Sequence, residues 1–202
     1  MTRIGLVGPC FSDPKILRRA LEFLLDEASA DEVIYLGVDG KIDRIMREWI
    51  DEVTHGRFDE VRFLDYAAQL ILRGSADEIA ELLDADQKVT RLRKIRSVPR
   101  PPERDVEMVS DRIVLVVYDK AILDEDDIAN ATLIVYGKSS EVFLKQFGPR
   151  YFFTPGPLEQ NRVAVIEVDS EQSVSIVAYD LQGTLVFRET LSARATKMQV
   201  RD

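Results

Sequence analysis

The chain has little of the residues that build disulfides and imidazole-rich metal centres. Among its 202 residues there is one cysteine, Cys10, and one histidine, His55. A single cysteine forms no disulfide within the chain and suits a reducing compartment. A single histidine rules out a binuclear metal centre that depends on several imidazole ligands. These shortages exclude a disulfide-stapled secreted domain and a multi-histidine metal site.

The chain also has fewer basic than acidic residues, and it has no long apolar run. Lysine and arginine number 27 against 36 aspartates and glutamates, which gives a net charge of −9. This balance argues against general binding to nucleic acid, because a basic surface is what attracts phosphates. No apolar run approaches the ~18 residues of a membrane span, and the N-terminal residues lack the apolar stretch of a secretory signal. We therefore expect a cytoplasmic protein with neither a membrane span nor a nucleic-acid partner.

Apolar residues are nevertheless abundant, at 46% of the chain, and their spacing predicts an α/β fold. In the first half strands and helices alternate. Strands are predicted at 3–8, 33–36 and 61–64. Helices are predicted after a cap at Ser12 or Asp13, at 41–54 and over most of 65–84. The second half is rich in strands, predicted at 112–118, 131–136, 151–153, 163–168, 173–179 and 184–188. This order predicts a two-sheet sandwich with helices, formed as a single domain over residues 1–202.

The most basic part of the chain is the segment at residues 88–104, inside a predicted excursion at about residues 86–105. One interpretation makes it a docking arm for an acidic partner. The contact residues of that arm would be Arg91, Arg93, Lys94 and Arg96. The other interpretation is a solvated loop whose charges pair with acids such as Asp84, Asp86 and Asp105. Both stay open, although the lack of aromatic residues weakens a stacking platform for single-stranded nucleic acid.

Short motifs at the ends of predicted elements are informative because of their order. They are Pro9-Cys10-Phe11, Gly37-Val38, Gly74-Ser75-Ala76-Asp77, Tyr118-Asp119 and Gly137-Lys138-Ser139-Ser140, followed by Thr154-Pro155-Gly156-Pro157. The set resembles the calcineurin-like metallophosphoesterase superfamily, in the branch of small single-domain phosphodiesterases that includes the phosphoesterase-fold subunit of the retromer coat. That family has Asp-x-His, Gly-Asp, Gly-Asn-His or Gly-Asn-Cys, His-Gly and Gly-His-Thr-His in this order. The resemblance covers roughly residues 3–168 and implies an αββα sandwich of two mixed sheets flanked by helices.

The resemblance also implies which residues stand in place of the metal ligands. The corresponding places hold Pro9, Phe11, Val38, Ser75, Tyr118, Lys138 and Ser140. Proline, phenylalanine and valine offer no side-chain donor, and the ammonium of Lys138 would repel a dication. A hydrolase without its metal ions cannot lower the pKa of a bound water in this way. The resemblance therefore predicts an inactive member without metal or other cofactor, which acts as a protein-binding, scaffold or regulatory subunit.

Two other functional interpretations stay open. A small-ligand sensor would hold a phosphate or nucleotide in the vestigial pocket, with Lys138, Ser139 and Arg73 as anion contacts. A divergent phosphodiesterase would have relocated its ligands, and the oxygen donors for one Mg²⁺ would then be Asp39, Asp77 and Asp119. Lys138 could instead form a structural ion pair with Asp39 or Asp119.

A protein partner is expected, and a homo-oligomer is left open. Phe143 and Phe147 lie in an apolar-aromatic stretch that could contact such a partner. They could equally belong to the core, because strands and helices of a folded domain bury apolar residues in any case.

Overall fold

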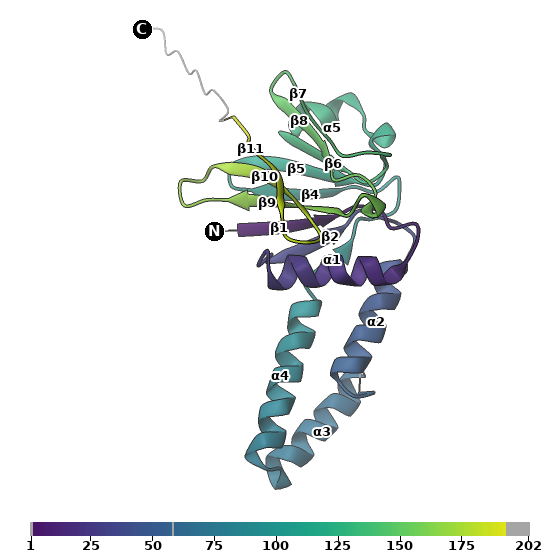
Figure 1. The fold of residues 1–202 in the computed structure, drawn as a ribbon, viewed down its shortest axis with the longest axis vertical. Helices are drawn as coiled ribbons and strands as arrows, with labels where there is room; N and C mark the ends of the chain where they lie inside the picture. Colours follow the sequence, from purple (N-terminus) through teal and green to yellow (C-terminus); the bar gives the residue numbers. More distant parts are fainter. Residues whose placement is uncertain (1, 58, 193–202) are drawn as a thin grey trace. The chain divides into compact units, whose positions relative to one another are not determined.

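The chain divides into two compact units, which we describe separately. The computed structural model describes residues 2–57 and 59–192. The first unit, called the sandwich unit, comprises Met1–Val38 and Val98–Asp202. The second, called the helical unit, comprises Asp39–Ser97. Figure 1 follows the chain through both units in colour.

The first sheet of the sandwich unit combines early and late parts of the sequence. In spatial order its strands are β11 (Leu185–Thr190), β10 (Val174–Asp180), β9 (Arg162–Val168), β1 (Thr2–Val7) and β2 (Glu32–Tyr35). β1 runs parallel to β2 and antiparallel to β9, so the sheet is mixed. Between β10 and β11 the Gly183 N–H donates to the Asp180 carbonyl at 3.1 Å. The hairpin predicted between the last two strands is confirmed.

The second sheet of the sandwich unit is also mixed. In spatial order its strands are β4 (Asp105–Val109), β5 (Arg112–Val117), β6 (Leu133–Tyr136), β8 (Arg150–Thr154) and β7 (Phe143–Phe147). The three central strands β5, β6 and β8 are parallel, while β4 and β7 run antiparallel at the edges. The central three match the predicted strands to within two residues at each end. The edge strands β4 and β7 have no counterpart among the predicted strands.

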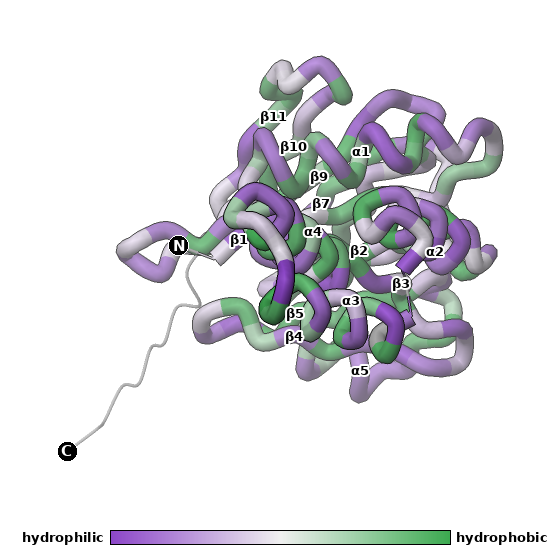
Figure 2. The backbone as a smooth tube through the Cα atoms, turned by 90° about the horizontal axis from the view of Figure 1, so that it is seen from below, coloured by the Kyte–Doolittle hydropathy of each residue, from purple (hydrophilic) through white to green (hydrophobic). Residues whose placement is uncertain are grey.

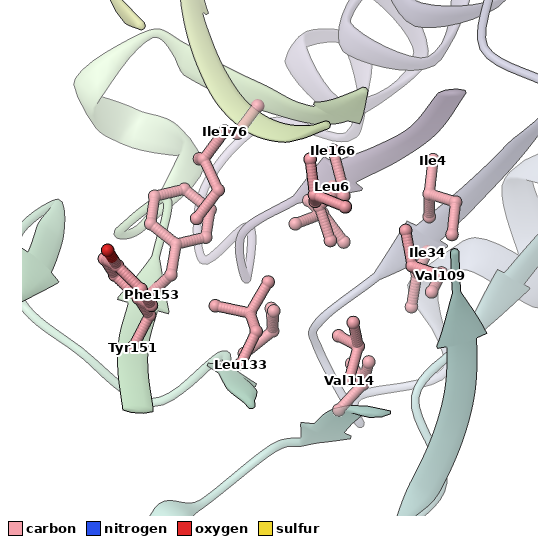
Figure 3. Close-up of a cluster of buried hydrophobic side chains, with 14 of the residues drawn as sticks. Ile4, Leu6, Ile34, Val109, Val114, Leu133, Tyr151, Phe153, Ile166 and Ile176 are labelled. Carbon is pink, nitrogen blue, oxygen red and sulfur yellow. The ribbon is translucent and has the colours of Figure 1, made fainter. Parts of the chain in front are cut away.

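The core of the sandwich unit lies between the two sheets. Side chains from both sheets point toward one another there, including Leu6, Ile34 and Ile166 from the first sheet and Leu133 and Phe153 from the second (Figure 3). All five are less than 2% exposed. At about 1.5–3 kcal/mol for each large apolar side chain removed from water, this layer is the main source of the unit's stability.

Helices cover the outer faces of both sheets. α1 (Pro14–Asp26) contacts β1, β2 and β9 of the first sheet. It begins as predicted, with the Asp13 side chain accepting from the Lys15 N–H and Pro14 in the first turn. On the second sheet, η1 (Lys120–Ile122) and α5 (Glu125–Asn130) supply Ile122 and Ile128 to a second buried cluster. The expected αββα sandwich of two mixed sheets is thus confirmed. A short helix, η2 (Leu158–Gln160), follows β8.

The helical unit consists of three helices and a short strand. These are α2 (Lys41–Val53), α3 (Glu60–Arg73), α4 (Ala76–Leu92) and β3 (Ile95–Ser97). The predicted interruption near residues 73–75 is confirmed, because α3 ends at Arg73 and Ser75 caps α4. The Ser75 Oγ accepts from the Glu78 N–H, and the Glu78 carboxylate accepts from the Ser75 N–H at 2.8 Å. This reciprocal capping box fixes where α4 begins.

The strand predicted at residues 61–64 is wrong. They were expected to form a strand, but they lie in the first turns of α3. The Asp59 side chain accepts from the Val61 and Arg62 N–H groups and so starts a helix just before this apolar run. A run of only four such residues fits a strand and a helix equally well, and here the Asp59 cap decides for the helix. Further along, α4 continues to Leu92, so the first residues of the basic segment are helical.

Hydrophobic and hydrophilic residues alternate along the helices, as the tube coloured by hydropathy shows (Figure 2). The described residues form no helix that combines the length and the apolar character needed to cross a membrane.

Candidate functional site

The carboxyl ends of the parallel strands define the candidate site. In open α/β sheets ligands bind at such ends, because the loops there carry the variable polar groups. Six of the predicted vestigial-pocket residues follow strands of the sandwich unit, namely Pro9, Phe11, Val38, Tyr118, Lys138 and Ser140. The seventh, Ser75, belongs to the helical unit.

Glycines bring the strand-end loops of the two sheets into backbone contact. A Cβ on Gly8, after β1, would lie 1.7 Å from the carbonyl oxygen of Gly156, after β8. A Cβ on Gly137, after β6, would lie 2.0 Å from the carbonyl oxygen of Leu36, after β2. No side chain fits at either place, so these positions require glycine. The loops of the candidate site are therefore held together by main chain.

An ion pair occupies the ends of β5 and β6. The Lys138 Nζ lies 2.5 Å from the Asp119 Oδ2, and the Lys138 N–H donates to the Tyr118 carbonyl at 2.7 Å. The other carboxylate oxygen of Asp119 accepts from the Ala121 N–H at 3.0 Å and caps η1. Asp119 is therefore engaged on both oxygens by groups of the sandwich unit.

The pair shifts both of its members toward the charged form. The hydrogen bond from Lys138 lowers the pKa of Asp119, and the Ala121 N–H adds to the effect. The same hydrogen bond raises the pKa of Lys138. Lys138 remains well exposed, so water screens much of this attraction. Both groups stay charged across the neutral range.

Glu159 organises the loop that follows β1. Its Oε1 accepts from the Phe11 N–H at 2.7 Å, the Ser12 N–H at 2.8 Å and the Ser12 Oγ at 2.9 Å. Partial burial acts to raise the pKa of Glu159, but these hydrogen bonds and one from its own backbone outweigh it, and the pKa is lowered. The Phe11 ring itself is 67% exposed, whereas Pro9 is buried. The loop is held by its backbone, and its side chains present no oxygen or nitrogen donor at positions 9 and 11.

The remaining strand-end residues are engaged locally. Val38 and Tyr118 are half-buried against the core between the sheets. The Ser139 Oγ donates to the Glu141 carbonyl at 2.7 Å, and the Ser140 carbonyl accepts from the Gln160 side chain at 2.7 Å. These contacts stabilise the turn after β6.

Several proposed ligand-binding groups lie in the helical unit. Ser75 caps α4, Arg73 ends α3, and Asp77 stands in the first turn of α4. Asp39 accepts from the Lys41 N–H at 3.1 Å and pairs with the Lys41 Nζ at 3.3 Å. The described part of the chain has no group of three or more His, Cys, Asp or Glu residues placed to hold a metal ion.

The two predicted partner surfaces differ in exposure. Phe143 is half-buried against the cluster on the outer face of the second sheet. Phe147 is exposed and meets Phe152 edge-to-face, with ring centroids 5.5 Å apart. The basic contacts Arg91, Arg93 and Lys94 are exposed, and Arg96 is half-buried in β3. Near the start of this segment Lys88 pairs with Asp84 at 2.6 Å, one turn earlier in α4.

Sequence reasoning missed two features of these units. Glu159 was not singled out, because its partners in the first loop are 148 and 147 positions away. The exposed apolar residues of α3 were hidden by the strand prediction at 61–64. A helical periodicity over residues 60–73 would have revealed them.

Comparison with known proteins supports the fold. No protein-family model matches the chain, and no curated protein matches it. Solved structures do match: a predicted phosphoesterase from Streptococcus pneumoniae is 14% identical, with a TM-score of 0.54 over 95% of this chain and 98% of that one. Yfce, a phosphoesterase from E. coli, is 13% identical, with a TM-score of 0.53 over 95% and 100%. A single mutant of Vps29 from Entamoeba histolytica is 12% identical, with a TM-score of 0.53 over 96% and 100%. At these identities the likeness shows that the chain has the fold of small metallophosphoesterases and of Vps29.

Proposed function

We propose that this chain is a non-hydrolysing protein of the metallophosphoesterase fold that binds other proteins. The observation that carries the proposal is the ion pair between Lys138 and Asp119 at the ends of β5 and β6. It puts an ammonium among the strand ends, where this fold holds cations. The carboxylate beside it is already satisfied by Lys138 and by the Ala121 N–H.

The neighbouring side chains fit a binuclear metal centre poorly. Such a centre needs carboxylate and imidazole donors that hold two cations and bridge a hydroxide. Pro9, Phe11 and Val38 have no donor atom in their side chains, and the ammonium of Lys138 repels a dication. His55, the chain's one histidine, stands in the helical unit. These side chains therefore do not supply the ligands for a metal-bound hydroxide.

The protein-binding part of the proposal is supported by the fold and by what is kept. The glycine contacts at Gly8 and Gly137 preserve the frame of the strand-end loops although the donors have changed. The resemblance to the phosphoesterase-fold subunit of the retromer coat offers an analogy for this fold serving in an assembly. A retained frame of this kind is compatible with a binding role.

Metal content and hydrolysis test the loss of catalysis. The purified chain is analysed for bound metals and then assayed with bis(p-nitrophenyl) phosphate and added Mn²⁺. We expect less than stoichiometric metal and no turnover above buffer. Robust turnover that is lost in Asp39→Ala or Asp119→Asn would establish relocated ligands and overturn the proposal.

Affinity capture tests protein binding. We expect a stable partner to be recovered with the tagged chain under mild conditions. A failure to recover one, together with a monomeric mass at high concentration, would count against a binding subunit.

A further inference from the structure

A groove in the helical unit is lined by one face of α2 and by the chain that leaves α4. The lining residues of α2 are three or four positions apart, so they share a face of that helix. α2 and α4 pack against each other within the unit (Figure 1). The groove has a volume of about 310 Å³. This size lies at the lower end of the range for small-molecule sites.

The floor of the groove is apolar. Leu92 and Ile95 are 3% and 8% exposed. Met46 and Ile50 of α2 are half-buried and line the same groove. Apolar surface in a concave site gains free energy when a ligand displaces water from it. The floor therefore favours a ligand with an apolar body.

The rim of the groove carries charged side chains. Arg47, Arg93 and Asp43 are exposed and complete the lining, so the rim has two positive charges and one negative charge. Among the residues that the structure describes, the guanidinium groups of Arg47 and Arg93 form no ion pair or side-chain hydrogen bond. A guanidinium offers N–H donors in a planar fork that matches the two oxygens of a carboxylate. The rim therefore favours a carboxylate head group.

The C-terminal end of α4 adds a smaller charge of opposite sign. The last carbonyls of a helix together carry about half a negative charge. α4 ends at Leu92, and Arg93 is its C-cap. The two guanidinium charges exceed the sum of the Asp43 carboxylate and this partial charge. The rim thus stays positive overall.

We propose that this groove binds a small amphipathic monocarboxylate, with its apolar body on the floor and its carboxylate facing Arg47 and Arg93. The site goes beyond the proposed protein-binding function, and all of its residues belong to the helical unit. A cationic amphiphile matches the floor but not the rim. A small anion such as acetate matches the rim but not the floor.

Three probes and methyl-detected NMR of the full chain test the proposal. Octanoate carries both features, acetate lacks the apolar body, and octyltrimethylammonium reverses the charge of the head group. The reporters are the methyl groups of the floor residues Met46, Ile50, Leu92 and Ile95. The Leu133 methyl groups, in the core of the sandwich unit, serve as the reference that no probe is expected to shift.

Two double variants separate the place of the charges from their number. Arg47→Gln/Arg93→Gln removes both guanidinium groups from the rim. Arg44→Gln/Lys94→Gln removes two exposed bases that neighbour the groove in sequence but do not line it. Each variant lowers the net charge by the same amount, so a difference between them reports on the rim itself.

Octanoate is expected to shift the floor methyl groups saturably, with a dissociation constant of about 1 mM, which is within reach of a ligand of about ten non-hydrogen atoms. Acetate and octyltrimethylammonium are expected to bind at least about fivefold more weakly. Arg47→Gln/Arg93→Gln is expected to weaken octanoate binding by about fivefold or more, because it removes charged hydrogen-bond donors. Arg44→Gln/Lys94→Gln is expected to stay within about twofold of wild type.

Four results would overturn the proposal. Octanoate could leave the floor methyl groups unshifted well above the expected dissociation constant, or octyltrimethylammonium could bind as tightly as octanoate. The two double variants could bind octanoate equally well. The floor methyl groups could instead shift with protein concentration in the absence of any probe, which would make the occupant a second copy of the chain.

Discussion

The sandwich unit and the helical unit use apolar residues in different ways. In the sandwich unit each sheet has a partner on both faces, and Leu133 and Phe153 are fully buried. In the helical unit α3 has one apolar face packed and the other exposed, so Leu72 is 80% exposed. The difference indicates that the sandwich unit holds most of the chain's stability. The helical unit carries exposed apolar surface that contributes little to folding.

A matched pair of leucine truncations gives the largest expected contrast between the units. Leu133→Ala removes a fully buried side chain and leaves a cavity, which should lower the free energy of unfolding by about 2–5 kcal/mol. Leu72→Ala removes an exposed side chain, and its free energy of unfolding should stay within about 0.5 kcal/mol of wild type. Urea unfolding followed by circular dichroism measures both. Equal losses would show that α3 is covered on both faces and would remove the contrast.

Two glycine substitutions give the next contrast. Gly8→Ala places a Cβ against the Gly156 carbonyl and forces the loop contacts apart, at a cost of about 3 kcal/mol. Gly56→Ala, in the helical unit, places its Cβ in open space, and the positive φ of 80° there costs about 1 kcal/mol. Thermal unfolding compares the two. If Gly8→Ala unfolds no earlier than Gly56→Ala, the main-chain contact between the strand-end loops is not tight.

Two serines of the sequence motifs, Ser75 and Ser139, should differ in their contribution to stability. Ser75→Ala removes the N-cap of α4 and should lower the free energy of unfolding by about 1 kcal/mol. Ser139→Ala removes a local hydrogen bond in an exposed turn and should change it by less than about 0.5 kcal/mol. Denaturant midpoints measured side by side decide this. A larger effect at Ser139 would point to a structural role for the turn after β6.

The smallest expected effect concerns the ion pair and its dependence on pH. The pKa of Asp119 is lowered from its ordinary value of 3.8, so the pair's contribution is present above that value and is lost as the pH falls through the lowered pKa. The pKa of Lys138 is raised from 10.5, so the contribution is present below that value and is lost as the pH rises through the raised pKa.

The free energy of unfolding of Lys138→Gln should therefore differ from that of wild type by a small, constant amount between about pH 5 and pH 9. This difference should fade in strong acid. The substitution should also move the pKa of Asp119 upward, which carbon-detected NMR titration measures. An unchanged titration of Asp119 would mean that the two side chains do not pair in solution.

The sequence predicted the sandwich unit better than the helical unit for a physical reason. β5 and β6 are short apolar runs rich in β-branched residues and bounded by turn residues, and this composition favours a strand over a helix. α3 is apolar on two faces, so its helical period is obscured, and the Asp59 cap decides the conformation. The edge strand β4 was missed because its exposed Val106 and Met108 alternate with polar residues only briefly.

The loops at the strand ends were predictable in place, but their contacts were not. Strand ends could be located from the apolar runs, which put Pro9 and Lys138 in the correct loops. The sequence left Asp39 and Asp119 as alternative partners of Lys138, and the structure shows the pair with Asp119. The role of Glu159 depends on tertiary contacts across most of the chain, and no local pattern reports such contacts.

The most direct test of the account is a crystal structure of the chain grown with millimolar Mn²⁺, with an anomalous difference map calculated at the strand ends. We expect no anomalous peak near Lys138 and Asp119, and the ammonium to remain against the carboxylate. Two peaks bound among the loops after β1, β2, β5 and β6 would contradict the account, because they would show that the site still holds the cations of a hydrolase.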